Sequence, residues 1–86
     1  MNRTINQKDL FALLVQQLTA SASMQLGMTP NPITRKTEVN LQAAEMTVGI
    51  LEALLFKTAG NLNKAENELL ASSVREMKTK LQEIKK

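Results

Sequence analysis

Apolar residues recur at the spacing of an α-helix in three segments of the chain, and two breaks separate these segments. The first break contains Gly27, Pro30 and Pro32, and the second is the short stretch 60–63. Glycine can end a helix, and proline cannot continue one. The pattern therefore predicts an all-α fold in a single domain over residues 1–86, with helices at about 7–26, 38–59 and 64–85 and a proline-containing linker at 27–36.

The first predicted helix has one main apolar face. Asn6 is the expected N-cap, and Asp9 falls in the first turn, where an acidic side chain favours the helix dipole. On a helical wheel, the residues of the apolar face are Phe11, Leu14, Val15, Leu18, Ala22 and Leu26. The small residues at 19–23 would allow another helix to approach closely.

The second predicted helix, with Thr37 as its expected N-cap, is apolar around most of its circumference. One stripe consists of Leu41, Ala44, Val48, Leu51 and Leu55. Another stripe, on the far side, consists of Val39, Ala43, Met46, Ile50, Ala53 and Leu54. Only a narrow strip is expected to face water, and it holds Gln42, Glu45, Gly49 and Glu52. A helix of this kind is typical of the middle of an assembly.

The third predicted helix begins with a capping box, in which Asn63 and Glu66 each accept from the other's backbone N–H. Its apolar residues follow the 4-3-4-3 spacing of a short coiled-coil seam, made of Leu70, Val74, Met77, Leu81 and Ile84. Glu76 and Lys80 are spaced for an ion pair across one turn. Because the link at 60–62 is so short, the second and third helices are expected to form an antiparallel hairpin.

The three helices together offer more apolar surface than three helices of one chain can cover. Burying apolar surface is worth roughly 25 cal/mol per Å², so a large exposed patch favours association. We therefore expect a homodimeric helical bundle, most simply with two-fold symmetry. The sequence leaves open which helices form the interface. The candidate core or dimer residues are Leu14, Leu18, Ala44, Val48, Ile50, Leu51, Leu54, Leu55, Leu70, Val74, Met77 and Leu81.

A short motif follows the second helix, Lys57-Thr58-Ala59-Gly60-Asn61-Leu62. It could be a binding loop in which Lys57 and Asn61 contact a ligand. The favoured interpretation is a helix cap, in which Gly60 adopts a left-handed conformation and Leu62 packs back on the last turn. The residues assigned to this helix-cap motif are Lys57, Thr58, Gly60, Asn61, Leu62, Asn63 and Glu66.

This motif and its surroundings resemble the domain of unknown function 1844 family, a group of short bacterial proteins. The matching features are the pair Leu26-Gly27, the two prolines of the linker, and Ala44, Leu51, Leu54 and Glu66. Asn63 stands where the family pattern has Thr, which preserves the capping chemistry. Glu45 and Gly49 depart from the charges of that pattern. The resemblance implies a helical fold and a bacterial source, and it implies no established activity.

The amino-acid composition excludes several classes of catalytic and metal-binding chemistry. The 86 residues include no Cys, His, Trp or Tyr, so thiolate chemistry, zinc or haem ligation and histidine acid–base catalysis are not expected. Glu38, Glu45 and Glu52 could hold a metal, but a solvated strip is the favoured interpretation of these residues. Met46 and Met77 are expected to fill gaps in the core rather than line a ligand pocket. We expect no enzyme activity, no catalytic, cofactor-binding or metal-binding residues, and no cofactor.

The remaining question is what the chain binds. Its 11 Lys and Arg against 8 Asp and Glu give a modest excess of positive charge, concentrated at 75–86. This basic C-terminal helix could contact nucleic acid through phosphates, but it offers no aromatic side chain for stacking. We expect no membrane span and a cytoplasmic location. The leading hypothesis is a non-enzymatic helical protein whose partner is a second copy of itself, with an unidentified protein partner possible. The alternative is a nucleic-acid-associated accessory protein.

Overall fold

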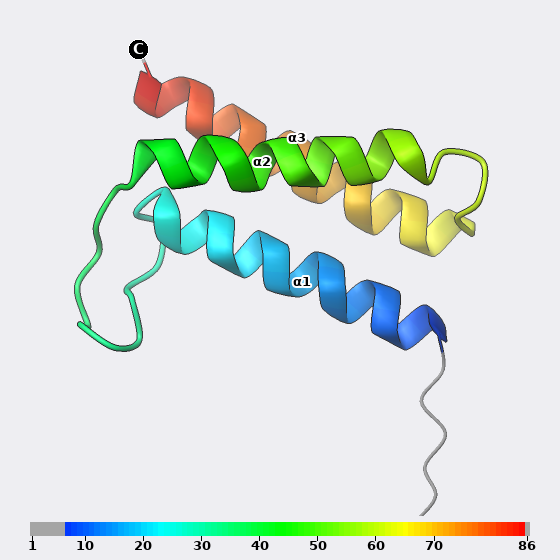
Figure 1. Ribbon diagram of the computed structural model, residues 1–86, viewed down its shortest axis with the longest axis horizontal. Coiled ribbons are helices and arrows are strands. Elements are labelled where there is room, and N and C mark those ends of the chain that lie inside the picture. The colour runs from blue at the N-terminus through cyan, green and yellow to red at the C-terminus, as the bar shows by residue number, and fades with distance from the viewer. Residues whose placement is uncertain (1–6, 86) are drawn as a thin grey trace, which may run out of the picture.

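The computed structural model describes the backbone of residues 7–85 and the side chains of residues 10–85. Over this range the chain forms α1 (Gln7–Gln25), α2 (Leu41–Lys57) and α3 (Lys64–Lys85), with a single isolated β-bridge and no strand. The predicted all-α class is confirmed. The expected N-cap Asn6 lies outside the described residues. Each helix packs against the other two, and α3 passes behind α2 in Figure 1.

The core is built from one face of each helix. The completely buried residues include Val15 of α1, Leu51 of α2 and Leu70 of α3. The full buried cluster comprises Val15, Ala22, Leu26, Ala44, Val48, Leu51, Leu70, Val74, Met77 and Leu81. The predicted coiled-coil seam of α3 is therefore used inside this chain, where it packs on α1 and α2.

The start of α2 differs from the prediction. The helix begins at Leu41 rather than near residue 38, and its N-cap is Asn40 rather than Thr37. The Asn40 side chain accepts from the Ala43 N–H at 3.1 Å. Val39 forms an antiparallel bridge with Leu26, and the Asn40 N–H donates to the Gln25 carbonyl at 2.8 Å. These contacts hold 39–40 extended against the end of α1, so the helix starts only after them.

The end of α1 is closed by a Schellman motif. Gly27 has a φ of 77°, and its N–H donates to the Met24 carbonyl at 3.1 Å. The Met28 N–H donates to the Ser23 carbonyl at 2.9 Å, which completes the pattern. A Cβ atom added to Gly27 would lie 3.0 Å from Cγ2 of Val39. Glycine is required at this position for two reasons: its backbone has a positive φ, and Val39 of the linker lies too close for a side chain.

The short link between α2 and α3 is organised by caps at both ends. The Thr58 N–H donates to the Leu54 carbonyl at 3.0 Å, and Gly60 has a φ of 86°. The predicted capping box is present, since the Glu66 N–H donates to Asn63 Oδ1 at 2.8 Å and the Asn63 N–H donates to Glu66 Oε1 at 3.1 Å. These caps satisfy backbone groups that helix ends otherwise leave without partners.

Replacing Leu51 by Asp tests the core. Leu51 is fully buried, so Leu51→Asp places a charge with no partner at the centre of the three helices. We expect a loss of at least about 4 kcal/mol in the free energy of unfolding, which is a large part of the stability of a domain of this size. Circular dichroism during thermal unfolding measures this loss. Thr79→Asp, on the exposed side of α3, is the matched control. An unchanged melting temperature for Leu51→Asp would contradict the assigned core.

The two left-handed glycines provide a second, paired test. Gly60→Ala should cost about 1 kcal/mol, because alanine disfavours a positive φ and nothing lies within 4 Å of the added Cβ. Gly27→Ala carries the same conformational cost and also presses on Val39, so we expect a loss of about 2 kcal/mol or more. Urea unfolding midpoints of the two variants measure the difference. Equal losses would show that Val39 moves aside at no cost.

Candidate interaction surface

Large apolar side chains remain exposed on two helices and the linker. The exposed set comprises Leu10, Leu13, Leu14, Met28, Ile33, Val39, Leu41, Met46, Ile50 and Phe56. Within residues 10–85, no member of this set belongs to α3. The apolar surplus expected from the sequence therefore lies on α1, α2 and the segment that joins them.

The predicted core or dimer residues divide into three groups. Ala44, Val48, Leu51, Leu70, Val74, Met77 and Leu81 belong to the buried cluster. Leu18, Leu54 and Leu55 are half-buried against that cluster. Leu14 and Ile50 are 43% and 46% exposed, so the structure separates them from the core. Leu14 was expected on the buried face of the first helix, but burial there centres on Val15 and Ala22, and Leu14 falls at its edge.

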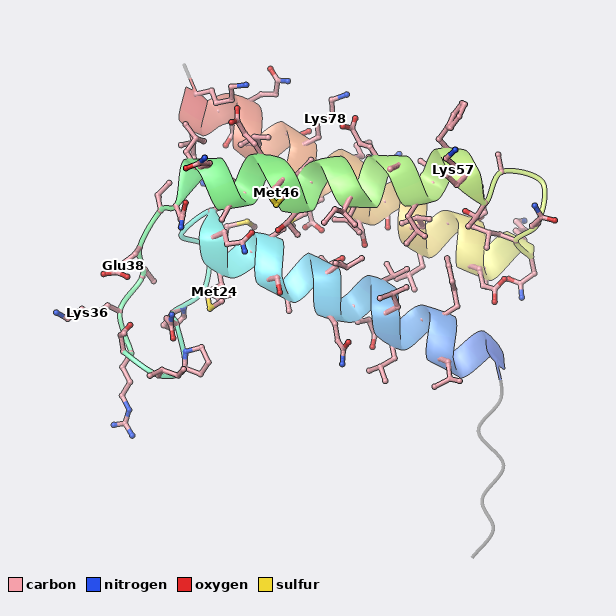
Figure 2. The ribbon with its side chains drawn as sticks, viewed as in Figure 1. Met24, Lys36, Glu38, Met46, Lys57 and Lys78 are labelled. Carbon is pink, nitrogen blue, oxygen red and sulfur yellow. The ribbon has the colours of Figure 1, made fainter. Side chains whose placement is uncertain are left out.

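The side of α2 opposite the core forms what we call the outer seam. Its residues follow a 4-3-4-3 spacing, and all are exposed: Gln42, Met46, Gly49, Ala53 and Phe56. Met46 is 65% and Phe56 is 79% exposed. Met46 was expected to fill a core gap, and that prediction was wrong; Figure 2 shows it on α2 among the labelled residues. Sequence reasoning assigned no role to Phe56, although its spacing from Gly49 and Ala53 was a readable signal.

Gly49 lies at the middle of the outer seam. A Cβ atom added there would have nothing within 4 Å outside its own helix backbone. Glycine in a helix interior costs about 1 kcal/mol relative to alanine. No contact within the described chain explains the glycine, because the inner side of α2 alone meets α1 and α3.

Charge is distributed very unevenly around this surface. No residue from Leu10 to Thr34 is charged, so the described side chains of α1 form an uncharged flank. On the other side of α2, Glu52 pairs with Lys78 of α3 at 2.7 Å, and Glu45 pairs with Lys85 at 2.9 Å. These exposed pairs tie α3 to α2 but add little stability, about 0–1 kcal/mol each. The predicted Glu76–Lys80 pair is replaced by a contact of Lys80 with Glu83 at 4.0 Å.

The carboxylates do not assemble a metal site. Glu45 and Glu52 each face a lysine, and Glu38 lies in the linker. Among the described residues there is no group of three or more His, Cys, Asp or Glu side chains close enough to hold a metal ion. No helix within the described part of the chain has the length and apolar character needed to cross a membrane.

The motif at 57–62 has the geometry of a helix end. Lys57 is the last residue of α2, and the Thr58 hydroxyl donates to the Leu54 carbonyl at 2.7 Å. The Asn61 N–H donates to the Thr58 carbonyl at 2.9 Å, and Leu62 is half-buried against the core. These contacts account for the motif as a cap, with Leu62 anchoring the turn.

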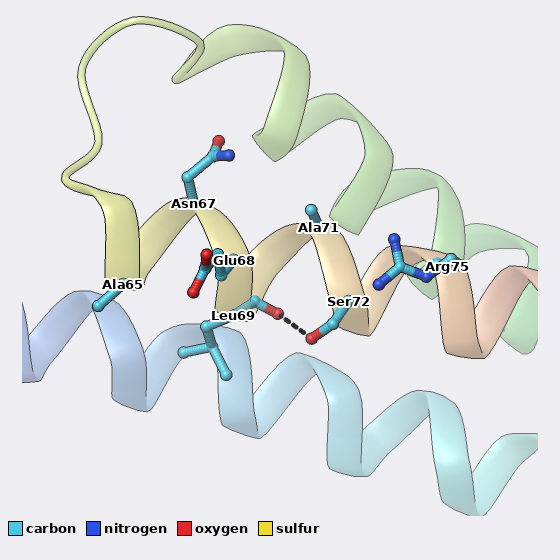
Figure 3. Close-up of a pocket in the computed structure, with 7 residues that line it drawn as sticks. All are labelled: Ala65, Asn67, Glu68, Leu69, Ala71, Ser72 and Arg75. Atoms are coloured by element: carbon cyan, nitrogen blue, oxygen red, sulfur yellow. Dashed lines mark hydrogen bonds between the residues drawn. The ribbon is translucent and has the colours of Figure 1, made fainter.

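Surface depressions offer little for a small ligand. One depression, of about 630 Å³, is lined by Ala65, Asn67, Glu68, Leu69, Ala71, Ser72 and Arg75 (Figure 3). All of these residues come from α3 alone, so a ligand would be contacted by one element. A second depression, of about 390 Å³ between α1 and α3, includes Met28 and Met77 in its lining. Neither brings together a set of convergent polar groups of the kind that fixes a ligand.

The fold and surface define a small three-helix domain with large apolar side chains exposed on α1, α2 and the segment that joins them. Within this class, the chain belongs to the family described as Domain of unknown function (DUF1844), whose model matches residues 8–83. No curated protein and no solved structure is significantly similar to the chain. Family membership therefore supplies no activity, and the function must be argued from the surface itself.

Gly49→Ala tests whether the chain itself needs this glycine. Because the added methyl group meets open space, we expect the variant to gain about 0.5–1 kcal/mol in the free energy of unfolding. Thermal unfolding over a dilution series measures the gain at the lowest usable protein concentration, where contacts between copies are fewest. A loss of stability at that limit would mean that something in the same chain packs on Gly49.

Proposed function

We propose that this protein is a non-enzymatic helical interaction protein that works by self-association. Its partner is a second copy, and the product is a homodimeric helical bundle in which the antiparallel α2–α3 hairpin of each copy forms one half. We place it in the bacterial cytoplasm, in keeping with the bacterial family that it resembles. The role that we propose for it is to form this assembly.

The observation that supports this proposal is the segregation of exposed apolar and charged residues. Large apolar side chains are exposed on α1, α2 and their linker, while nine of the residues in α3 are charged. Exposed apolar patches of several hundred Å² are typical of interaction sites. The fold therefore presents one surface suited to water and another suited to a protein partner.

A second copy suits this surface because both partners then contribute the same uncharged side chains. In a two-fold interface the exposed apolar residues of one copy are covered by the equivalent patch of the other. A stable interface covers about 800 Å² of each partner, or about one eighth of the 6112 Å² accessible surface of this chain. The broad side of the molecule, about 41 by 33 Å, has room for such an area.

The basic C-terminal helix gives weaker support to a nucleic-acid role. Lys78 and Lys85 are paired with carboxylates of α2, and Lys80 lies near Glu83. These carboxylates compete with phosphate for the same ammonium groups. The contacts favour a role for Lys78 and Lys85 in holding α3 against α2, and we do not propose nucleic acid as the partner.

Size-exclusion chromatography with light scattering tests self-association. At micromolar concentration we expect a mass twice the 9.5 kDa of one chain. Phe56→Glu should raise the dissociation constant at least about tenfold, because it buries a charge in the interface. Thr79→Glu adds the same charge to the exposed side of α3 and should leave the mass unchanged. A mass of one chain for the unmodified protein across the concentration range would refute the proposal.

A further inference from the structure

The outer seam of α2 has the spacing that helices use to pair with one another. Gln42, Met46, Gly49, Ala53 and Phe56 alternate steps of four and three residues, which is the spacing of a coiled-coil seam. The seam of α3 with the same spacing is buried inside this chain. The outer seam of α2 is exposed along its whole length. The fold therefore buries one helix-pairing surface, on α3, and leaves a second one, on α2, exposed to solvent.

The side chains of the outer seam are placed symmetrically about the level of Leu51. Met46 and Phe56 stand five positions to either side of this level, and Gly49 and Ala53 stand two positions to either side. An antiparallel copy with its two-fold axis at this level would therefore set each Met46 against Phe56 of the second copy. It would also set each Gly49 against Ala53 of the second copy.

We propose that the second copy docks on the outer seam, with the two α2 helices antiparallel and in this register; the proposal rests on the self-association proposed above. The small pair at the centre lets the helix backbones come close, which accounts for a glycine that meets nothing in its own chain. The large pair at each end brings a thioether against an aromatic ring, a favourable contact. The same arrangement covers Met46 and Phe56, which are the most exposed large apolar side chains of α2.

The flanks of the seam favour the antiparallel orientation. Thr47 donates to Gln25 of α1 at 2.7 Å, and the Glu52–Lys78 pair marks the side of α2 toward α3. Antiparallel docking places like flanks together, so the α1 side, with Ile50 at its edge, meets the same side of the second copy. On the other flank the two Glu52–Lys78 pairs come side by side, and in each of them the carboxylate is already paired with its own lysine at 2.7 Å. Parallel docking would instead set the α1 flank of one copy, where Ile50 lies, against the α3 flank of the other, where the Glu52–Lys78 pair lies.

Cysteine cross-linking tests the register, because the chain contains no cysteine of its own. Met46→Cys and Phe56→Cys are prepared separately, and each is oxidised alone. The two variants are also mixed, left until subunits have exchanged, and then oxidised together. We expect the mixture to form covalent dimers containing one chain of each variant, at least about tenfold faster than either variant alone. Intact mass spectrometry identifies the mixed species. In the proposed register, like cysteines are ten positions apart along the helix, or about 15 Å, too far for a disulfide.

Each outcome separates the register from self-association itself. Thr79→Cys, on the exposed side of α3, gives the background rate of collisional cross-linking, and circular dichroism verifies that each variant is folded. Rapid homodimers from Met46→Cys and Phe56→Cys alone would show parallel docking and overturn the proposed register. A mixture no faster than the background, while the unmodified protein is dimeric by light scattering, would place the second copy elsewhere and leave self-association standing. A protein of one-chain mass would remove both proposals.

Discussion

The structure depends on the burial of one side of α2 between α1 and α3. Ala44, Val48 and Leu51 are almost completely buried there, and both neighbouring helices pack against this side. A chain of 86 residues buries a smaller fraction of its surface than a larger domain does, so a single core must supply most of the stability. The caps at the ends of the helices position the chain so that all three helices reach this one core.

This constraint decides which surfaces remain. The large apolar residues of α3 all lie in the core or pack against it, and its remaining positions are largely polar or charged. The core uses only one side of α2, and the N-terminal half of α1 keeps leucines at its edge that the other helices do not cover. The exposed apolar surface is thus what remains of two strongly apolar helices after α3 has covered the inner side of each.

The sequence predicted the class of fold and many of the buried residues because helical periodicity is a local signal. The spacing of Leu70, Val74 and Met77 identified a buried seam, and the capping box at Asn63 and Glu66 fixed where α3 begins. The start of α2 could not be predicted, because a bridge between Val39 and Leu26 keeps Thr37 from acting as the cap. Helical periodicity also could not predict that Leu14 and Met46 are exposed, because their exposure depends on how α1 and α2 are rotated about their axes. The pattern therefore placed Gln42 and Gly49 in a polar strip and Met46 and Ala53 in an apolar stripe, and it left Phe56 unassigned.

Gly49 connects the stability of the chain to its proposed assembly. A glycine there lowers the helix-forming tendency of α2, and no neighbour in the chain makes use of the space it leaves. Alanine would stabilise the separate chain, so a function based on the separate chain gives no physical reason for glycine. Close approach of a second helix gives such a reason, because small residues at the centre of the seam allow the two helix backbones to come close together. Binding that favours the folded state also stabilises it by mass action. The outer seam is distinct from the core, so a second copy can add this stability without any rearrangement of the three helices.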